Sequence, residues 1–158
     1  MTMEDMIKEV VDGCPNHRVV VKPHPLERDY GMQSIDRVRQ AGYRFDVTDA
    51  NVHDILDASI AVASVNSSVS FEGFMHRKPS VVFGRTDFQS LVETVRAPGQ
   101  FAAALATVRD REWDFAGMLH WYFKCHTIRV RSNKFERLLA LQVERSGVEP
   151  ASFGLGAV

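Results

Sequence analysis

The sequence contains little cysteine. Cys14 and Cys125 are the only two cysteines among 158 residues, and neither lies in a CxxC pair or in a Cys/His cluster at the spacing of a metal site. A disulfide scaffold, a redox-active thiol pair and a structural zinc site are therefore not expected. We predict that the protein uses neither a metal nor a cofactor.

A net charge of one sign is also missing. Lys and Arg together number 19, and Asp and Glu 20, which gives a formal net charge of -1 at pH 7. A protein without an overall cationic field does not attract nucleic acid through its charge. We therefore predict no nucleic-acid partner, and any bound anion has to be held by a local site.

Long hydrophobic runs are absent as well. No segment approaches the roughly 18 apolar residues that span a bilayer, and the N-terminal MTMEDMIKEVVDG lacks the continuous apolar stretch of a signal peptide. These features predict a cytoplasmic protein. The 45% hydrophobic content is enough for one domain with a real core, but the chain is too short for two full domains.

Short apolar runs alternate with helix-like segments along most of the chain. Runs rich in β-branched residues and bounded by turn-forming residues are typical of parallel strands, in which both faces are covered. The predicted strands are 19–22, 43–47, 60–64 and 80–83, while 89–95 is ambiguous. The predicted helices are 3–11, 33–40, 51–58, 67–76 and 98–108, with a mostly helical region at 113–144.

This alternation predicts an α/β fold, a Rossmann-like open parallel sheet with helices on both faces. We expect the domain, including its C-terminal helices, to occupy residues 1–146 and a flexible tail to occupy 147–158. Ligands bind such sheets outside the carboxyl ends of the strands. The places to look for chemistry are therefore the loops after Lys22, Val47, Ser64 and Phe83.

The first of these loops contains the sequence VKPHP at 21–25. Two prolines fix the backbone and remove N–H donors, so they form a stiff platform from which His24 can present an imidazole N–H to an anion. An ordinary strand exit, in which His24 bonds a nearby carbonyl group, is the alternative. The sequence alone leaves both interpretations open.

A hydroxyl-rich turn, ASVNSSVS at 63–70, follows another predicted strand. Backbone N–H groups, hydroxyls and the positive end of the next helix meet at such a turn, which can bind phosphate without a net positive charge. Simple capping of the helix by Asn66 or Ser67 is the alternative. Glu72 lies four residues after Ser68 on the same helical face, where it is either a partner for a ribose hydroxyl or a solvated surface residue.

The segments VVVKPHP and ASVNSSVSFEGFMHRKPSVVFG resemble two motifs of GT-B glycosyltransferases, the HP motif and the serine-pair motif of the C-terminal nucleotide-binding domain. The resemblance is to the capsule polysaccharide biosynthesis proteins that use CMP-activated Kdo. Bacterial sialyltransferases, whose donor is CMP-sialic acid, share both motifs. The similarity covers about residues 19–84, and most of its specificity comes from the order and spacing of two short motifs.

This resemblance implies that the chain is the donor-binding half of a GT-B enzyme, with a CMP-sugar, CMP-Kdo in particular, as the donor. In those families the HP histidine and the serine pair contact the donor phosphate. By motif position, the residues expected near the phosphate are His24, Asn66, Ser67 and Ser68. The residues expected near the nucleoside are Lys22, Pro25, Asp49 and Glu72.

The same resemblance implies partners that lie outside the chain. A GT-B enzyme closes two Rossmann-like domains around donor and acceptor, and in the sialyltransferases the general base is a carboxylate of the N-terminal domain. We therefore expect a missing N-terminal domain, a glycan or glycolipid acceptor, peripheral membrane association of the full enzyme, and no sugar transfer by this chain alone. The catalytic base stays unassigned, because nothing in the spacing marks Asp46 or Asp49 for that role.

Other α/β functions lack their motifs here. Lys22-Pro23 stands on the first predicted strand, whereas the Lys-Pro turn of a phosphoacceptor receiver domain comes late in the chain. No GxGxxG and no GxSxG is present, which argues against a dinucleotide-binding domain and a serine hydrolase. The remaining alternative is a non-catalytic nucleotide- or phosphate-binding module with a regulatory or assembly role. The aromatic-rich segment 113–126 fits either a core helix or an interface to a missing domain.

Overall fold

The computed structural model describes residues 1–24, 26, 28–127 and 135–146. The chain divides into two compact units, Met1–Ala116 and Gly117–Val158, which we call the N-terminal and the C-terminal unit. The tail predicted at 147–158 lies outside the described residues, as does Pro25.

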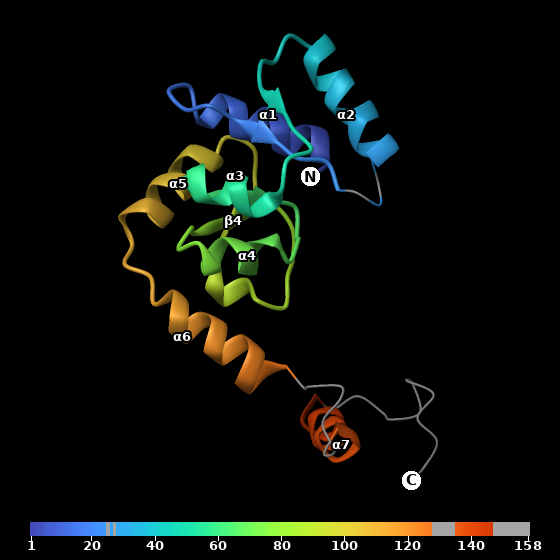
Figure 1. The fold of residues 1–158 in the computed structure, drawn as a ribbon, viewed down its shortest axis with the longest axis vertical. Coiled ribbons are helices and arrows are strands. Elements are labelled where there is room, and N and C mark those ends of the chain that lie inside the picture. Colours follow the sequence, from blue (N-terminus) through green and yellow to red (C-terminus); the bar gives the residue numbers. More distant parts are fainter. Residues whose placement is uncertain (25, 27, 128–134, 147–158) are drawn as a thin grey trace. The chain divides into compact units, whose positions relative to one another are not determined.

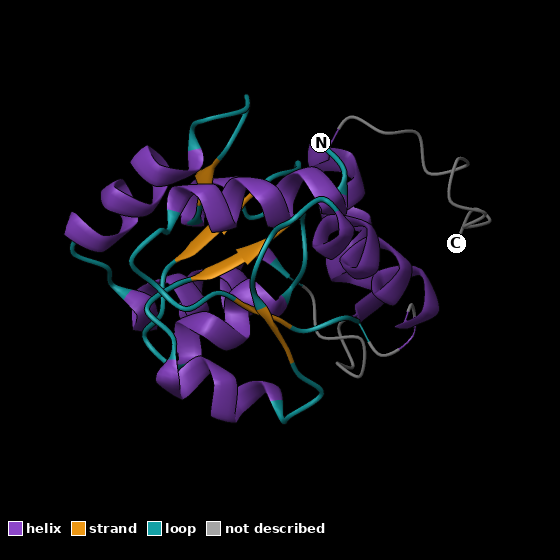
Figure 2. Ribbon diagram, turned by 90° about the horizontal axis from the view of Figure 1, so that it is seen from above, coloured by secondary structure: helices purple, strands orange, loops and turns teal. Residues whose placement is uncertain are grey.

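The N-terminal unit alternates helices and short strands (Figure 1). Its helices are α1 (Met3–Gly13), α2 (Arg28–Gln40), α3 (Val52–Ala58), α4 (Val69–Met75), the 3-10 helix η2 (Gln89–Leu91) and α5 (Phe101–Asp110). Its strands are β1 (Val20–Val21), β2 (Asp46–Val47), β3 (Val62–Ser64), β4 (Ser80–Val82) and β5 (Glu93–Thr94). Figure 2 shows strands lying between helices, as expected for an α/β fold.

All strand pairs in this unit are parallel. β1 pairs with β2, which places Val20 opposite Asp46. A second sheet has the order β3-β4-β5, with Val62 opposite Ser80 and Val82 opposite Thr94. The prediction of an open parallel α/β fold is therefore confirmed. Strands β1 to β4 lie within the four predicted runs and are shorter than them, and the ambiguous segment 89–95 holds η2 and the edge strand β5.

The two sheets differ in how far they are covered. Every residue of β4 is buried, as predicted for a strand covered on both faces. Val20 in β1 is 39% exposed, so the same prediction is wrong for β1. Val21 and Val47 pack on a cluster formed by α1 and α2, and this cluster covers only one face of the two-stranded sheet.

The larger core cluster lies between α5 and the three-stranded sheet. It contains Val81 of β4 together with Phe101, Leu105 and Val108 of α5. Val19, directly before β1, packs against the same cluster as Ala61 and Ala63. The two sheets therefore share a core, although their strands pair separately.

Several helices begin at residues other than those predicted; α5, for example, begins at Phe101 instead of residue 98. α2 begins at Arg28 instead of residue 33, because Gly31 does not break it. Gly31 packs closely on the loop after β1, and a Cβ atom there would lie 3.1 Å from Pro23 Cβ. α4 begins at Val69, two residues later than predicted.

In the C-terminal region α6 (Phe115–His120) continues as the π-helix η3 (Trp121–His126), and α7 (Phe135–Ser146) follows. The mostly helical character predicted for 113–144 agrees with these elements at 115–126 and 135–144, whereas 128–134 lie outside the described residues. Among the residues that the structure describes, no helix combines the length and the apolar composition needed to cross a membrane.

Candidate functional site

Lys22 joins the carboxyl end of β1 to the loop after β2. Its Nζ donates hydrogen bonds to the carbonyl oxygen of Ala50 at 2.7 Å and to that of Asp49 at 3.3 Å. Hydrogen bonds from a charged donor are stronger than neutral ones. Lys22 therefore fixes the two strand exits relative to each other, and part of its charge is already used by the protein.

His24 is exposed at the same end of β1. Its Nδ1 accepts a hydrogen bond from the backbone N–H of Leu26 at 3.3 Å. Because Nδ1 is the acceptor, the neutral ring carries its proton on Nε2. The Nε2–H group is thus available as a donor to an anion. The alternative interpretation expected His24 to bond a nearby carbonyl group, whereas in the structure its ring accepts from a backbone N–H.

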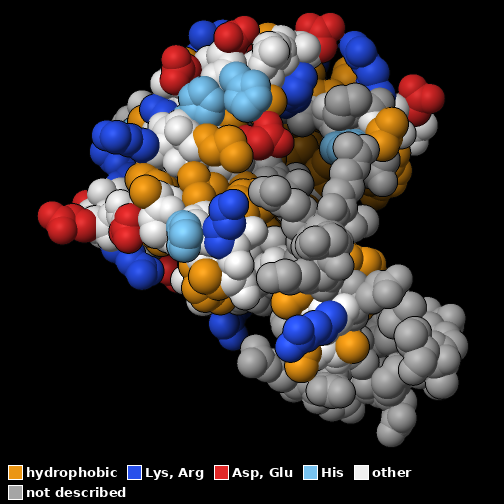
Figure 3. All heavy atoms as spheres, turned by 60° about the horizontal axis from the view of Figure 1, so that its bottom comes forward, with side chains coloured by type: hydrophobic (Ala, Val, Ile, Leu, Met, Phe, Trp, Pro, Cys, Tyr) orange, Lys and Arg blue, Asp and Glu red, His pale blue; other side chains and the backbone are white. Residues whose placement is uncertain are grey.

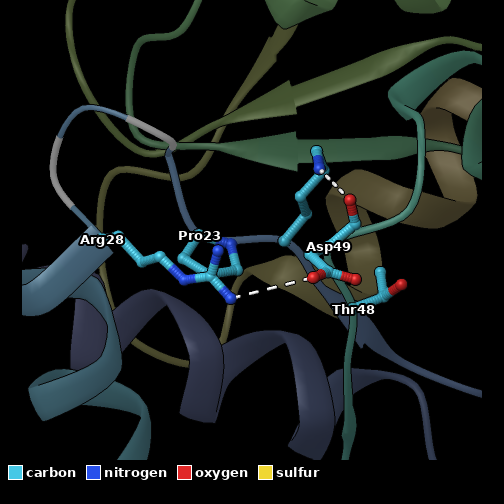
Figure 4. A pocket seen from close by; sticks show the side chains of 5 residues that line it. Pro23, Arg28, Thr48 and Asp49 are labelled. Carbon is cyan, nitrogen blue, oxygen red and sulfur yellow. Dashed lines mark hydrogen bonds and ion pairs between the residues drawn. The ribbon is translucent and has the colours of Figure 1, made fainter.

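A hollow of about 250 Å³ lies between the exits of β1 and β2, lined by Lys22, Pro23, Arg28, Thr48 and Asp49 (Figure 4). Arg28 Nη2 and Asp49 Oδ2 are 3.8 Å apart, and the two side chains are 64% and 83% exposed. A pair so exposed is weak and can exchange its partner for a ligand. The hollow therefore offers a cation and a carboxylate side by side.

Sequence reasoning named Lys22 and Asp49 but missed Arg28 and Thr48. Arg28 was missed because α2 was expected to begin later, which left this residue in an undefined loop. Thr48 directly follows β2, so its position at a strand exit was the available signal. Its Oγ1 accepts a hydrogen bond from the N–H of Ala50 at 3.1 Å and thereby shapes the loop.

The hydroxyl-rich turn after β3 is exposed at Asn66, Ser67 and Ser68. Ser67 donates its N–H to Ser64 Oγ at 3.3 Å, and its own Oγ accepts from the N–H of Val69 at 3.2 Å. Ser68 is the N-cap of α4 and makes no side-chain capping bond. The two serines therefore differ, because Ser67 builds the turn while the hydroxyl of Ser68 is not used for capping.

The exit of β4 lies against this turn. A Cβ atom at Gly84 would come within 3.0 Å of the carbonyl oxygen of Val65 and 3.6 Å of Asn66 Cβ. Two residues later, the hydroxyl of Thr86 is buried without a hydrogen-bond partner. Sequence reasoning pointed to the loop after Phe83 but singled out no residue in it. Glu72, predicted near the nucleoside, is half-buried on α4.

The structure brings some of the predicted residues together and keeps others apart. Lys22 and Asp49 line one hollow. His24 and the turn at 66–68 follow strands of different sheets, and no hydrogen bond or ion pair joins them in the described part of the chain. Their convergence on one phosphate stays a prediction. Within the same described residues no group of three or more His, Cys, Asp or Glu side chains is arranged to hold a metal ion.

A family model described as "Capsule polysaccharide biosynthesis protein" matches residues 1–93. The matched part covers more than half of the chain and contains both strand-exit motifs, with β1 to β4 and α1 to α4. No curated protein and no solved structure matches the chain.

Proposed function

The chain belongs to the capsule polysaccharide biosynthesis family, and on that premise we propose that it binds the nucleotide-sugar donor of a GT-B glycosyltransferase. A role in capsule synthesis follows from the family. The donor is proposed to be a CMP-sugar, with CMP-Kdo the first candidate. The observation that carries the proposal is the presence of a polar motif at the exits of both β1 and β3, inside the matched residues 1–93.

The donor phosphate is assigned to His24 and the turn at 66–68. His24 has an exposed ring whose Nε2–H is free to donate, and Ser68 has a hydroxyl that makes no capping bond. Asn66 adds an exposed amide in the same turn as Ser68. Neutral donors of this kind bind an anion without the net positive charge that the sequence lacks.

The nucleoside is assigned to the hollow between β1 and β2. Pro23 supplies an apolar wall, while Arg28 and Asp49 supply a donor and an acceptor for polar edges of the base or ribose. Lys22 holds the wall in place through its bonds to the loop after β2. Glu72 and Pro25 are proposed as further contacts on the strength of the motifs alone.

Transfer of the sugar is proposed to need a second domain. The donor half binds and orients the leaving nucleotide, whereas the acceptor, a glycan or glycolipid, and the general base are expected from an N-terminal domain. Positioning two reactants supplies much of the rate of such reactions. The isolated chain should therefore bind CMP and transfer no sugar. Cytoplasmic location and peripheral membrane association belong to the same proposal for the full enzyme.

Calorimetric titration with CMP, UMP and inorganic phosphate tests this assignment. His24→Ala and the double variant Ser67→Ala/Ser68→Ala should each weaken CMP binding about ten- to a hundredfold, as expected for the loss of a hydrogen bond to a charged group. His17→Ala and Ser90→Ala change exposed residues of the same types and should leave CMP affinity unchanged.

Three outcomes would decide against the proposal. Absence of CMP binding at millimolar concentration contradicts the donor site. Equal affinity for CMP and inorganic phosphate favours the regulatory or assembly module. Sugar transfer by the isolated chain contradicts the need for a second domain.

A further inference from the structure

Three side chains form a hydrogen-bonded chain between α3 and the C-terminal end of α4, and none of them belongs to the candidate site. Asp57 Oδ1 lies 3.0 Å from His76 Nδ1, and His76 Nε2 lies 3.0 Å from His53 Nδ1. The two imidazole rings stack with their centroids 5.2 Å apart. Histidine side chains lie next to each other on the face seen in Figure 3.

The backbone holds both histidines in fixed places. His76 is the C-cap of α4, and the next residue, Arg77, has a positive φ of 56°. The N–H of Arg77 bonds the carbonyl of Phe74 at 3.0 Å, and that of Lys78 bonds the carbonyl of Gly73 at 2.8 Å. These two bonds form a Schellman motif, which fixes the end of a helix.

His53, at the other end of this row of three side chains, is held by the N-terminus of α3. Asn51 caps α3 by accepting a hydrogen bond from the N–H of His53 at 2.9 Å. His53 and Asp57 are four residues apart on α3, so they lie on one face of this helix. Both therefore meet His76 from the same side of α3, which explains how one ring can contact two residues at once.

The order of the three side chains determines where their protons lie. The ionised carboxylate of Asp57 accepts only, so His76 Nδ1 must carry a proton. In a neutral His76 the Nε2 atom is then an acceptor, and His53 Nδ1 must donate to it. The remaining nitrogen, His53 Nε2, is unprotonated. When both imidazole rings are neutral, each of the two histidines is therefore in the Nδ1–H form.

The same logic describes what happens when protons are added. One proton can enter at His53 Nε2, because His53 Nδ1 still donates to His76 and both contacts survive. A second proton has to enter at His76 Nε2, where it would face the N–H of His53. Two donors cannot share a hydrogen bond. The second proton therefore breaks the contact between the histidines.

We propose that Asp57, His76 and His53 form a proton-binding clamp between α3 and α4. The clamp stays closed when the two histidines carry no added proton or one added proton, and it opens when they carry two. Charged groups of both signs surround the three side chains. Lys78 Nζ donates to the carbonyl oxygen of Asp57 at 3.0 Å. Asp54 follows His53 on α3, and Arg77 is exposed beside His76. The His76 side chain is only 21% exposed, whereas that of Asp57 is 82% exposed.

Nitrogen NMR of the full chain tests the clamp directly. At about pH 7.5, where unperturbed histidines are neutral, Nδ1 of His53 and of His76 should be protonated, and a scalar coupling should connect His53 Nδ1 to His76 Nε2 through the hydrogen bond. The coupling should disappear as the second proton enters on lowering the pH to about 5. An unprotonated His76 Nδ1 at neutral pH, or the absence of the coupling, overturns the proposal.

A stability measurement provides a second, independent test. The second proton breaks a contact that only the folded state has, so the unfolded chain binds this proton more readily. The free energy of unfolding therefore decreases as the pH is lowered. The urea midpoint of the wild type should therefore drop between about pH 7.5 and 5. In His53→Asn an amide donates in place of Nδ1–H but cannot titrate, so the drop should shrink. His17→Asn, which removes an exposed histidine elsewhere, should behave like the wild type. Equal drops in all three proteins contradict the clamp.

Discussion

The hydroxyl oxygens of Ser70 and Ser80 lie 2.7 Å apart, and both side chains are fully buried. Ser80 Oγ also lies 3.5 Å from the carbonyl oxygen of Val62. The pair thus connects α4 to β4 and β3 through polar groups inside an apolar core. A buried hydroxyl that loses its partner costs more than a pair that is removed together.

This asymmetry predicts the result of a double-mutant cycle. Ser80→Ala leaves the hydroxyl of Ser70 buried without its partner and should lower the free energy of unfolding by about 1–3 kcal/mol. Ser70→Ala/Ser80→Ala should cost less than the sum of the two single changes. Urea unfolding of the four proteins measures both quantities. Additive losses would mean that the two hydroxyls do not interact.

Gly73 in α4 is expected to tolerate no side chain. A Cβ atom there would lie 2.8 Å from Val62 Cγ2 and 3.3 Å from the carbonyl oxygen of Lys78. Overpacking of this kind typically costs about 1–3 kcal/mol, so Gly73→Ala should lower the urea midpoint. Val62→Ala removes the closest contact, and the double variant should be more stable than the two single losses predict. A double variant that is no more stable than the sum of the two single losses would assign the cost of Gly73→Ala to the contact with the carbonyl oxygen of Lys78.

Asp49 is expected to decide between cytosine and uracil if the nucleoside occupies the hollow. Its carboxylate can accept from the exocyclic amine of cytosine but faces an oxygen atom in uracil. Wild type should prefer CMP over UMP, and Asp49→Asn should lose about tenfold or more of that preference. Asp29→Asn, another exposed acid near the start of α2, should keep it. If Asp49→Asn prefers CMP over UMP as strongly as the wild type does, the base does not bind in this hollow.

The two cysteines should differ in reactivity. Burial raises the pKa of the Cys14 thiol, and Cys14 is only 8% exposed, whereas Cys125 is exposed. Because the thiolate is the reactive form, an alkylating reagent should label Cys125 first and Cys14 only upon unfolding. Mass spectrometry after limited alkylation measures the order.

The same thiol predicts a stability loss at alkaline pH. A raised pKa in the folded state means that the contribution of Cys14 is complete below the ordinary thiol value of about 8.5 and is lost as the pH rises through the folded value. Cys14→Ala should flatten this alkaline decline in urea unfolding, and Cys125→Ala should not. An identical decline in both variants would assign it to other groups.

Much of the fold was predictable because its signals are local. The buried runs at Val62–Ser64 and Ser80–Val82 consist of small or β-branched residues bounded by turns, and such runs pair wherever helices cover both faces. The solvent exposure of Val20 was not predictable, because the helices that pack on a strand come from segments far away in the sequence. The early start of α2 was hidden for a similar reason. Gly31 breaks helices by propensity, yet here its missing side chain lets Pro23 pack close.

The sequence by itself determined the parallel α/β fold, the two polar motifs at strand exits and their resemblance to a family, because each rests on residues close together in the chain. The tertiary structure decided which side chains meet. It placed Arg28 beside Asp49, tied Lys22 to Ala50 and set His53 against His76. Contacts of this kind join residues of separate elements, and their geometry follows from the packing of helices and sheets, which no local pattern encodes.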